Sequence, residues 1–359
     1  SSPRSFTTNR APGCRGDECC ALTKMASALA NPAAVHACKV GMISFMAEKI
    51  LSLRAATKRK PSARAGRPRP PVSDFAGAQR WATVLAMSLR ILHFSDVHLP
   101  VPPGAYRLTE IFHPKRGVAL INFALRRAAK YRDAQQKLNG LRDFLAREPV
   151  DYLLYTGDTL NFGLEGEFMA GAPRLMETLA LARRGALAAP GNHDLYTHGG
   201  RALHRKYFAP LLRSDLPEAC TPTGFPLVRW LGDDAVAIAF NSARPRLPFW
   251  DSSGRVPALE LDALEQLLDM PEIAARRHIF LMTHYPFDEA GYFHGLRNSR
   301  ALLRVLQGRE NLVLLHGHNH RPYTHFLPDS ATPVYCAGSL SKAGGESFWF
   351  FDLFGTTVN

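Results

Sequence analysis

Residues 87–98 read MSLRILHFSDVH, a β-prone apolar run that stops at a loop carrying Asp96 and His98. The run is typical of a first core strand. Short apolar runs of the same kind, each ending at a small or polar residue, recur at 89–94, 152–155, 187–189, 235–240, 278–282 and 312–315. We therefore predict a series of strands that each lead into a loop with reactive side chains.

Between several of these runs lie segments with the apolar period of a helix, at 116–147, 167–184, 258–268 and 296–307. Strands that alternate with helices predict an α/β layered fold. In such folds reactive residues gather on loops at strand ends, because a rigid strand fixes where the loop begins.

Charge divides the chain into two parts. Residues 1–86 contain 14 Lys and Arg against 4 Asp and Glu, and residues 87–359 contain 30 against 27, so the net charge of +13 resides mainly in the first part. Duplex binding draws most of its affinity from cationic contacts to phosphates. The nearly neutral second part therefore speaks against nucleic acid as a partner.

The first part is rich in Ala, Arg, Pro and Ser, and such a segment cannot bury enough apolar surface to offset its ordering entropy. Met87 resembles a natural start residue, because the first predicted core strand follows it directly. We expect residues 1–86 to be a disordered basic extension or a mis-assigned start, and residues 87–359 to be the functional domain.

Cysteine usage and hydropathy bear on the compartment. After residue 86 the chain contains only Cys220 and Cys336, which are too far apart in sequence to form a disulfide framework, so we predict a reducing, cytoplasmic environment. The best candidate for a membrane span, residues 40–53, is interrupted by Glu48 and Lys49. No membrane span is expected.

Five loops carry the kinds of side chain that bind metal ions. A single Asp-x-His or Gly-Asp at a strand end is usually a helix cap or a turn, but five in series are hard to attribute to turn chemistry. Imidazole and carboxylate donors without a nearby cysteine suit Mn, Fe or Zn, and the donors suffice for two ions. The loops contain Asp96-Val97-His98, Gly157-Asp158, Gly191-Asn192-His193-Asp194, Thr283-His284 and Gly317-His318-Asn319-His320.

This ordered series resembles the motifs of the calcineurin-like metallophosphoesterase superfamily, and the resemblance covers nearly all of residues 87–354. It implies an α/β fold in the form of a four-layer α-β-β-α sandwich, with a dinuclear metal site at the strand ends. It also implies two sets of ligands that share one carboxylate. The first set is Asp96, His98, Asp158 and His320, and the second is Asp158, Asn192, His284 and His318.

The resemblance also implies a mechanism for hydrolysing phosphate esters. Two metal ions lower the pKa of a bridging water and neutralise the phosphoryl oxygens, so a metal-bridging hydroxide would be the nucleophile. His193 would be the general acid that protonates the leaving group, and Asp194 would orient its imidazole.

Candidate substrate contacts lie on the same loops. Asn192 and His193 would meet the phosphate, and Asn161 would either meet it or cap the following turn. His294 lies after the loop of a metal ligand, where it would either touch the substrate or belong to the surface.

The interval between Asp96 and Asp158 is longer than compact members of the superfamily usually show, and it contains Lys115 and Arg116. These two residues would contact the phosphate if the insertion forms a wall of the pocket. The favoured alternative places them on the solvated face of a helix.

Within the superfamily, the chain resembles the small bacterial group that includes cyclic-nucleotide phosphodiesterases. A small phosphate ester is the expected substrate, and the oligomeric state is left open. One alternative is a phosphomonoesterase acting on a nucleotide or sugar phosphate. The alternative from a different class is a non-catalytic metal-binding scaffold, which the complete motif set disfavours.

Overall fold

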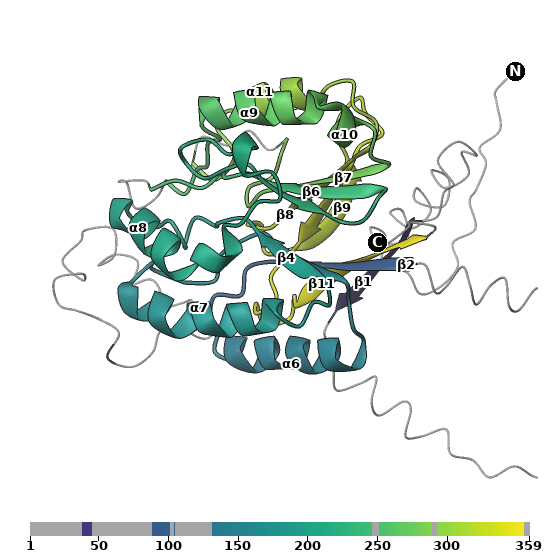
Figure 1. Ribbon diagram of the computed structural model, residues 1–359. Helices are drawn as coiled ribbons and strands as arrows, with labels where there is room; N and C mark the ends of the chain where they lie inside the picture. Colours follow the sequence, from purple (N-terminus) through teal and green to yellow (C-terminus); the bar gives the residue numbers. More distant parts are fainter. Residues whose placement is uncertain are drawn as a thin grey trace, which may run out of the picture. The chain divides into compact units, whose positions relative to one another are not determined.

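The computed structural model describes residues 38–44, 88–100, 104, 131–245, 251–288 and 293–354. The fold belongs to the compact unit Lys39–Asn359. Figure 1 shows two β-sheets stacked between layers of helices. This arrangement confirms the expected α/β fold with an α-β-β-α order of layers.

The first sheet places three parallel strands at its centre and one end. In spatial order it contains β1 (Cys38–Ser44), β11 (Ser347–Phe354), β2 (Ser88–Phe94), β3 (Tyr152–Tyr155) and β4 (Gly185–Ala188). β2, β3 and β4 are parallel, and β11 runs antiparallel to β2. Because the last residues of β2, β3 and β4 pair with one another, the loops that follow them begin at the same edge.

The second sheet has the same character, with four parallel strands and an antiparallel strand at each side. In spatial order it contains β5 (Leu227–Trp230), β6 (Ala235–Ala239), β7 (His278–Met282), β8 (Leu312–His316), β10 (Pro333–Ala337) and β9 (Pro322–Phe326). β6 and β7 are buried along nearly their whole length, which explains their continuous apolar sequences.

Helices cover the outer face of each sheet (Figure 1). On the first sheet, α6 (Ala134–Arg147) and α7 (Glu165–Leu179) bury Leu138, Leu141, Phe168 and Leu175 in one apolar cluster with residues of β2 and β3. On the second sheet lie α9 (Ala258–Asp269), α10 (Pro271–Ala274) and α11 (Ser299–Leu306). Between β4 and β5 the chain forms α8 (His198–Tyr207) and the 3₁₀ turns Ala209–Leu211 and Pro217–Ala219.

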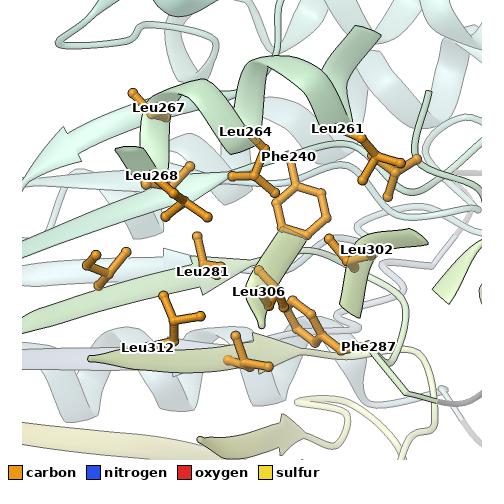
Figure 2. Close-up of a cluster of buried hydrophobic side chains, with 14 of the residues drawn as sticks. Phe240, Leu261, Leu264, Leu267, Leu268, Leu281, Phe287, Leu302, Leu306 and Leu312 are labelled. Atoms are coloured by element: carbon orange, nitrogen blue, oxygen red, sulfur yellow. The ribbon is translucent and has the colours of Figure 1, made fainter. Parts of the chain in front are cut away.

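Figure 2 shows the second apolar cluster, where α9 and α11 pack on β7 and β8. Leu264, Leu281 and Leu302 are fully buried there. Burial of such a side chain is worth about 1.5–3 kcal/mol. The two sheets meet through aromatic rings, since the Phe280 and Phe351 ring centroids are 5.4 Å apart. The metal-binding loops thus stand on a rigid, doubly covered frame.

The observed elements match the predicted ones with shifted ends. The six predicted strands correspond to β2, β3, β4, β6, β7 and β8, and the predicted helices at 167–184, 258–268 and 296–307 correspond to α7, α9 and α11. The helix predicted at 116–147 is observed over Ala134–Arg147, and residues 116–130 lie outside the described part. Of the expected extension 1–86, the structure describes β1 as an edge strand; the rest lies outside the described residues.

A buried carboxyl on α9 gives the fold a pH-dependent stability. Glu260 accepts hydrogen bonds from Thr223 Oγ1 (2.7 Å) and the Asn241 amide (3.1 Å), and burial raises its pKa from 4.5 to about 7. The folded protein therefore holds a proton that the unfolded chain releases above pH 4.5, so stability is lost as the pH rises from about 4.5 to 7.

We expect Glu260→Gln to be more stable than the wild type at pH 8, by about 1–3 kcal/mol, and no more stable at pH 4. The glutamine can still accept from the Asn241 amide and donate to Thr223 Oγ1. Thermal unfolding at both pH values measures the difference. An equal difference between variant and wild type at the two pH values would contradict the raised pKa.

Candidate metal centre

The candidate metal ligands are delivered by five parallel strands of the two sheets. β2 leads to Asp96 and His98, β3 to Asp158, and β4 to the loop with Asn192. β7 leads to His284, and β8 leads to His318 and His320. The carboxyl ends of the parallel strands within a sheet lie at one edge, where α/β folds commonly place their sites.

The first group of side chains consists of Asp96, His98, Asp158 and His320. One ligand atom from each lies within 4.8 Å of the others. His320 Nε2 is 2.8 Å from Asp96 Oδ1 and 3.1 Å from His98 Nε2. Asp96 Oδ1 is buried and accepts no hydrogen bond from any described residue. An oxygen in that position needs a cation to compensate its loss of solvation.

The second group consists of Asp158, Asn192, His284 and His318. His284 Nε2 lies 3.2 Å from Asp158 Oδ2 and 3.0 Å from Asn192 Oδ1. His318 Nδ1 lies 3.1 Å from the same Asn192 oxygen and 3.3 Å from His284 Nε2. Asp158 Oδ2 is also 3.8 Å from His98 Nε2, so one carboxylate oxygen faces both groups.

Hydrogen bonds fix which imidazole nitrogen faces the centre. His98 Nδ1 contacts the Leu160 carbonyl (3.0 Å), and His284 Nδ1 contacts the Thr156 carbonyl (2.7 Å). A carbonyl only accepts, so each Nδ1 carries the hydrogen and each Nε2 presents its lone pair inward. In His318 the two nitrogens exchange these roles. Its Nε2 contacts the His294 carbonyl at 2.9 Å and carries the hydrogen, so its Nδ1 presents the lone pair inward. Lone pairs that converge in this way fit divalent cations.

The electrostatics of the centre point the same way. Burial alone would lower the pKa of His284, but the adjacent Asp158 carboxylate raises it to about 9. Burial and the charge of His284 lower the pKa of His318 to about 3. The negative potential of Asp158, which favours a proton on His284, equally favours a divalent cation in the place of that proton.

Backbone strain concentrates at the same residues. Five of the seven candidate ligands have φ in the left-handed region, where a residue with a Cβ costs about 1–3 kcal/mol. The main chain at Asp96 is held by two hydroxyl groups, because Ser339 Oγ and Ser341 Oγ donate to the Asp96 carbonyl at 2.8 and 3.2 Å. The five are Asp96 (55°), His98 (44°), Asp158 (64°), His318 (68°) and His320 (52°).

Two glycines make the close approach of the loops possible. A Cβ on Gly191 would lie 2.0 Å from Asp158 Oδ1, and a Cβ on Gly317 would lie 2.3 Å from Asp96 Oδ2. Any other residue at either position would displace a carboxylate of the centre. The glycines of the Gly-Asn-His-Asp and Gly-His-x-His motifs are therefore part of the site's construction.

A family model described as calcineurin-like phosphoesterase matches residues 89–322. The chain belongs to this family. It is a metal-dependent phosphoester hydrolase that binds divalent metal ions. No curated protein matches the sequence significantly.

Two solved structures resemble the phosphoesterase chain. A dimetal phosphatase from Danio rerio matches with a TM-score of 0.54 and 13% identity, over 75% of this chain and 98% of that one. A purple acid phosphatase from yellow lupin (Lupinus luteus) seeds matches with a TM-score of 0.44 and 12% identity, over 76% of this chain and 46% of that one. At these identities the first structure supports the phosphoesterase fold and nothing finer.

The general-acid candidate of the phosphoesterase, His193, lies beside the first group of ligands. Its ring centroid is 5.0 Å from that of His98, and the ring stacks on Tyr196 at 5.6 Å. Its amide donates to Asp158 Oδ1 at 2.8 Å, and its Nδ1 lies 2.6 Å from the Asn161 carbonyl. These contacts tie the His193 ring to both neighbouring loops.

Asp194 was expected to orient the His193 imidazole, and in the structure the Asn161 carbonyl contacts His193 Nδ1. Asp194 is buried, and its carboxylate accepts from the amides of Asp158 (2.9 Å), Thr159 (2.9 Å) and Gly191 (3.0 Å). Burial and the charge of Asp158 raise the pKa of Asp194 to about 7. The Asp194 carboxylate therefore holds the loop of Asp158 and the loop of Gly191 together.

The remaining candidate substrate contacts differ in their surroundings. The Asn161 side chain is buried and donates to the Leu99 carbonyl at 2.6 Å, which favours the structural alternative for this residue. His294 is exposed, with Nδ1 2.7 Å from Ser252 Oγ, and its carbonyl supports a metal ligand. Lys115 and Arg116 lie outside the described residues.

Sequence reasoning missed Tyr131, which precedes α6. Its hydroxyl lies 2.9 Å from His320 Nδ1, and its ring lies 4.7 Å from that of His98. Tyr131 belongs to no motif and comes from the long insertion between the first two ligand loops. A phenol there fixes the orientation of His320 towards the centre.

We expect Tyr131→Phe to weaken metal binding by about 10–100-fold while leaving the fold intact, because an outer partner of a metal-binding histidine is lost. Titration of metal-free protein with Mn²⁺ measures the affinity. Tyr323→Phe is the matched control, since its hydroxyl lies 3.2 Å from Nε2 of His316, which is not a candidate ligand. Equal effects of the two substitutions would show that Tyr131 acts through general stability alone.

Proposed function

We propose that the chain is a dinuclear phosphodiesterase whose two ions are held by the two side-chain groups that share Asp158. The observation that carries the proposal is the convergence of carboxylate oxygens and imidazole lone pairs on both sides of Asp158 Oδ2. A single ion would leave one of these groups without a positive partner. We further propose that the catalytic domain spans residues 87–359.

The ions, when bound, would lower the pKa of a water molecule and neutralise the phosphoryl oxygens. The chain's own residues would do the rest. Asn192 would hold the second ion through Oδ1 and contact the phosphate. His193, with its Nδ1 donating to the Asn161 carbonyl, would deliver a proton from Nε2 to the leaving oxygen. Asp194 would hold the loops of Asp158 and Gly191 in their relative positions through its hydrogen bonds to their amides.

The charges around the centre support a diester in preference to a monoester. A monoester carries up to two negative charges, whereas a diester carries one. Among the described residues, the side chains that contact the candidate ligands include imidazole, carboxylate, amide, phenol and hydroxyl groups, and the Lys342 ammonium contacts the His320 carbonyl (3.2 Å). A phosphomonoesterase would use Lys115 and Arg116 to supply further positive charge.

The test compares two esters that share a leaving group. Wild-type protein with added Mn²⁺ should hydrolyse bis-p-nitrophenyl phosphate with a kcat/KM at least about tenfold above that for p-nitrophenyl phosphate, and EDTA should abolish both activities. The reverse preference would establish the monoesterase alternative. Binding of two ions without turnover of either ester would establish the scaffold alternative.

Two finer assignments accompany the proposal. Mixed nitrogen and oxygen donors suit Mn, Fe or Zn as the resident ions, and metal analysis of protein from its native cells would identify them. Cys220 and Cys336 are free thiols, which supports a reducing, cytoplasmic compartment. Among the described residues, no helix has the length and apolar character that crossing a bilayer requires.

A further inference from the structure

A cavity of about 320 Å³ lies between α8, the strand ends of β5 and β6, and α9. Its size is at the lower end of the range for small-molecule pockets. Pro190 and Leu195, which line it, flank the Gly191–Asp194 loop on either side. Of the described residues that line the cavity, none is a candidate metal ligand.

The cavity lining includes a largely buried imidazole. His204 is 8% exposed, and its imidazole makes no hydrogen bond to another described residue. Burial and the neighbouring Arg205 lower the pKa of His204 to about 4, so the ring is neutral and offers one donor and one acceptor. An imidazole in that state can form a hydrogen bond to a polar ligand in the cavity.

Positive charge gathers at the same cavity. Arg201 and Arg205 of α8 line it, and Arg205 Nη2 donates to the Thr223 carbonyl at 3.0 Å. Glu260 also lines the cavity, and above its pKa of about 7 its carboxylate opposes a doubly charged anion there. Two exposed guanidinium groups and one buried carboxyl therefore favour a singly charged ligand, and a carboxylate matches the guanidinium fork.

Most of the remaining lining is apolar and includes Leu195, Leu212 and Phe225, with Thr223 and Asn241 as the polar exceptions. Such walls suit a hydrocarbon body attached to the charged group. We propose that this cavity binds a small carboxylate with an aryl or alkyl body, its carboxylate on Arg201, Arg205 and the His204 imidazole N–H and its body against the apolar walls. The site is separate from the metal centre, and the proposal does not depend on the proposed function.

The test uses 4-fluorobenzoate as the probe, followed by ¹⁹F NMR with the full chain. We expect saturable binding that persists after the metals are removed with EDTA, and little binding of the neutral analogue 4-fluorobenzamide. Arg201→Gln should weaken binding at least about tenfold, because the carboxylate loses a guanidinium partner. Arg300→Gln, an exposed substitution on α11, is the matched control and should leave binding unchanged.

A second variant guards against a trivial loss of folding. His204→Phe replaces the polar contact with a larger apolar ring and should abolish binding while thermal unfolding reports an intact fold. Loss of binding on EDTA treatment would place the probe at the metals and overturn the proposal. Equal binding of the amide, or no saturable binding at millimolar probe, would overturn it as well.

Discussion

Asp158→Asn should lower the turnover of bis-p-nitrophenyl phosphate by more than about 10³-fold, because water activation and charge neutralisation both depend on the metals. Asp158 Oδ1 accepts the His193 amide at 2.8 Å, so an asparagine would keep its carbonyl oxygen there. Its NH₂ group would then take the place of Oδ2, 3.2 Å from His284 Nε2. A donor would occupy the position where both ligand groups require a shared acceptor.

The measurement is the metal content per chain after dialysis, together with turnover. We expect two ions in the wild type and fewer than two in the variant, since the shared ligand is lost. Asp269→Asn is the control: its side chain is 65% exposed and pairs with Arg309 on the surface, so content and turnover should not change. Two tightly bound ions in Asp158→Asn would contradict a shared carboxylate.

Most of the parallel strands were predictable because their chemistry is visible in the sequence. Each of β2, β3, β6, β7 and β8 is a short apolar run that stops at a polar loop. The antiparallel edge strands β5 and β9 were missed, because edge positions tolerate mixed sequences such as PYTHF in β9. The parallel strand β10 was missed as well. β11, with the sequence SFWFFDLF, is aromatic enough that the same reasoning could have found it.

The composition of the candidate site was predictable from its motifs, but its internal geometry was not. The structure brings the seven expected side chains into two groups that share Asp158. The motifs do not reveal which atom orients each ring. Asp194 stands next to His193 in the chain, yet its carboxylate binds amides across the loop, and the Asn161 carbonyl contacts the imidazole instead.

Tertiary partners of this kind arise from segments that meet only after folding. Tyr131 reaches His320 across 189 positions of the chain, and no local spacing announces such a pair. The left-handed backbone at the ligands is equally hidden, because Asp and His carry no local requirement for it. Surrounding contacts impose that conformation, and the sequence specifies those contacts only through the whole fold.

His193→Asn should slow hydrolysis by about 10²–10⁴-fold while the metal content stays at the wild-type value. The His193 side chain is absent from both ligand groups, so removing it should cost no ligand. Its amide, which donates to Asp158 Oδ1, is retained in the variant. Metal analysis and turnover on one preparation separate the two effects, and loss of the ions would assign His193 to metal binding instead.

The size of this effect should depend on the leaving group. A p-nitrophenolate leaves readily without a proton, whereas the alkoxide released from a cyclic nucleotide must be protonated as the bond breaks. His193→Asn should therefore slow a cyclic nucleotide at least about tenfold more than bis-p-nitrophenyl phosphate. His325→Asn, whose ring pairs with Asp288 at 2.7 Å, should slow neither ester. Equal slowing of both esters by His193→Asn would mean that the imidazole binds the phosphate, because phosphate contacts are common to the two substrates and proton delivery is not.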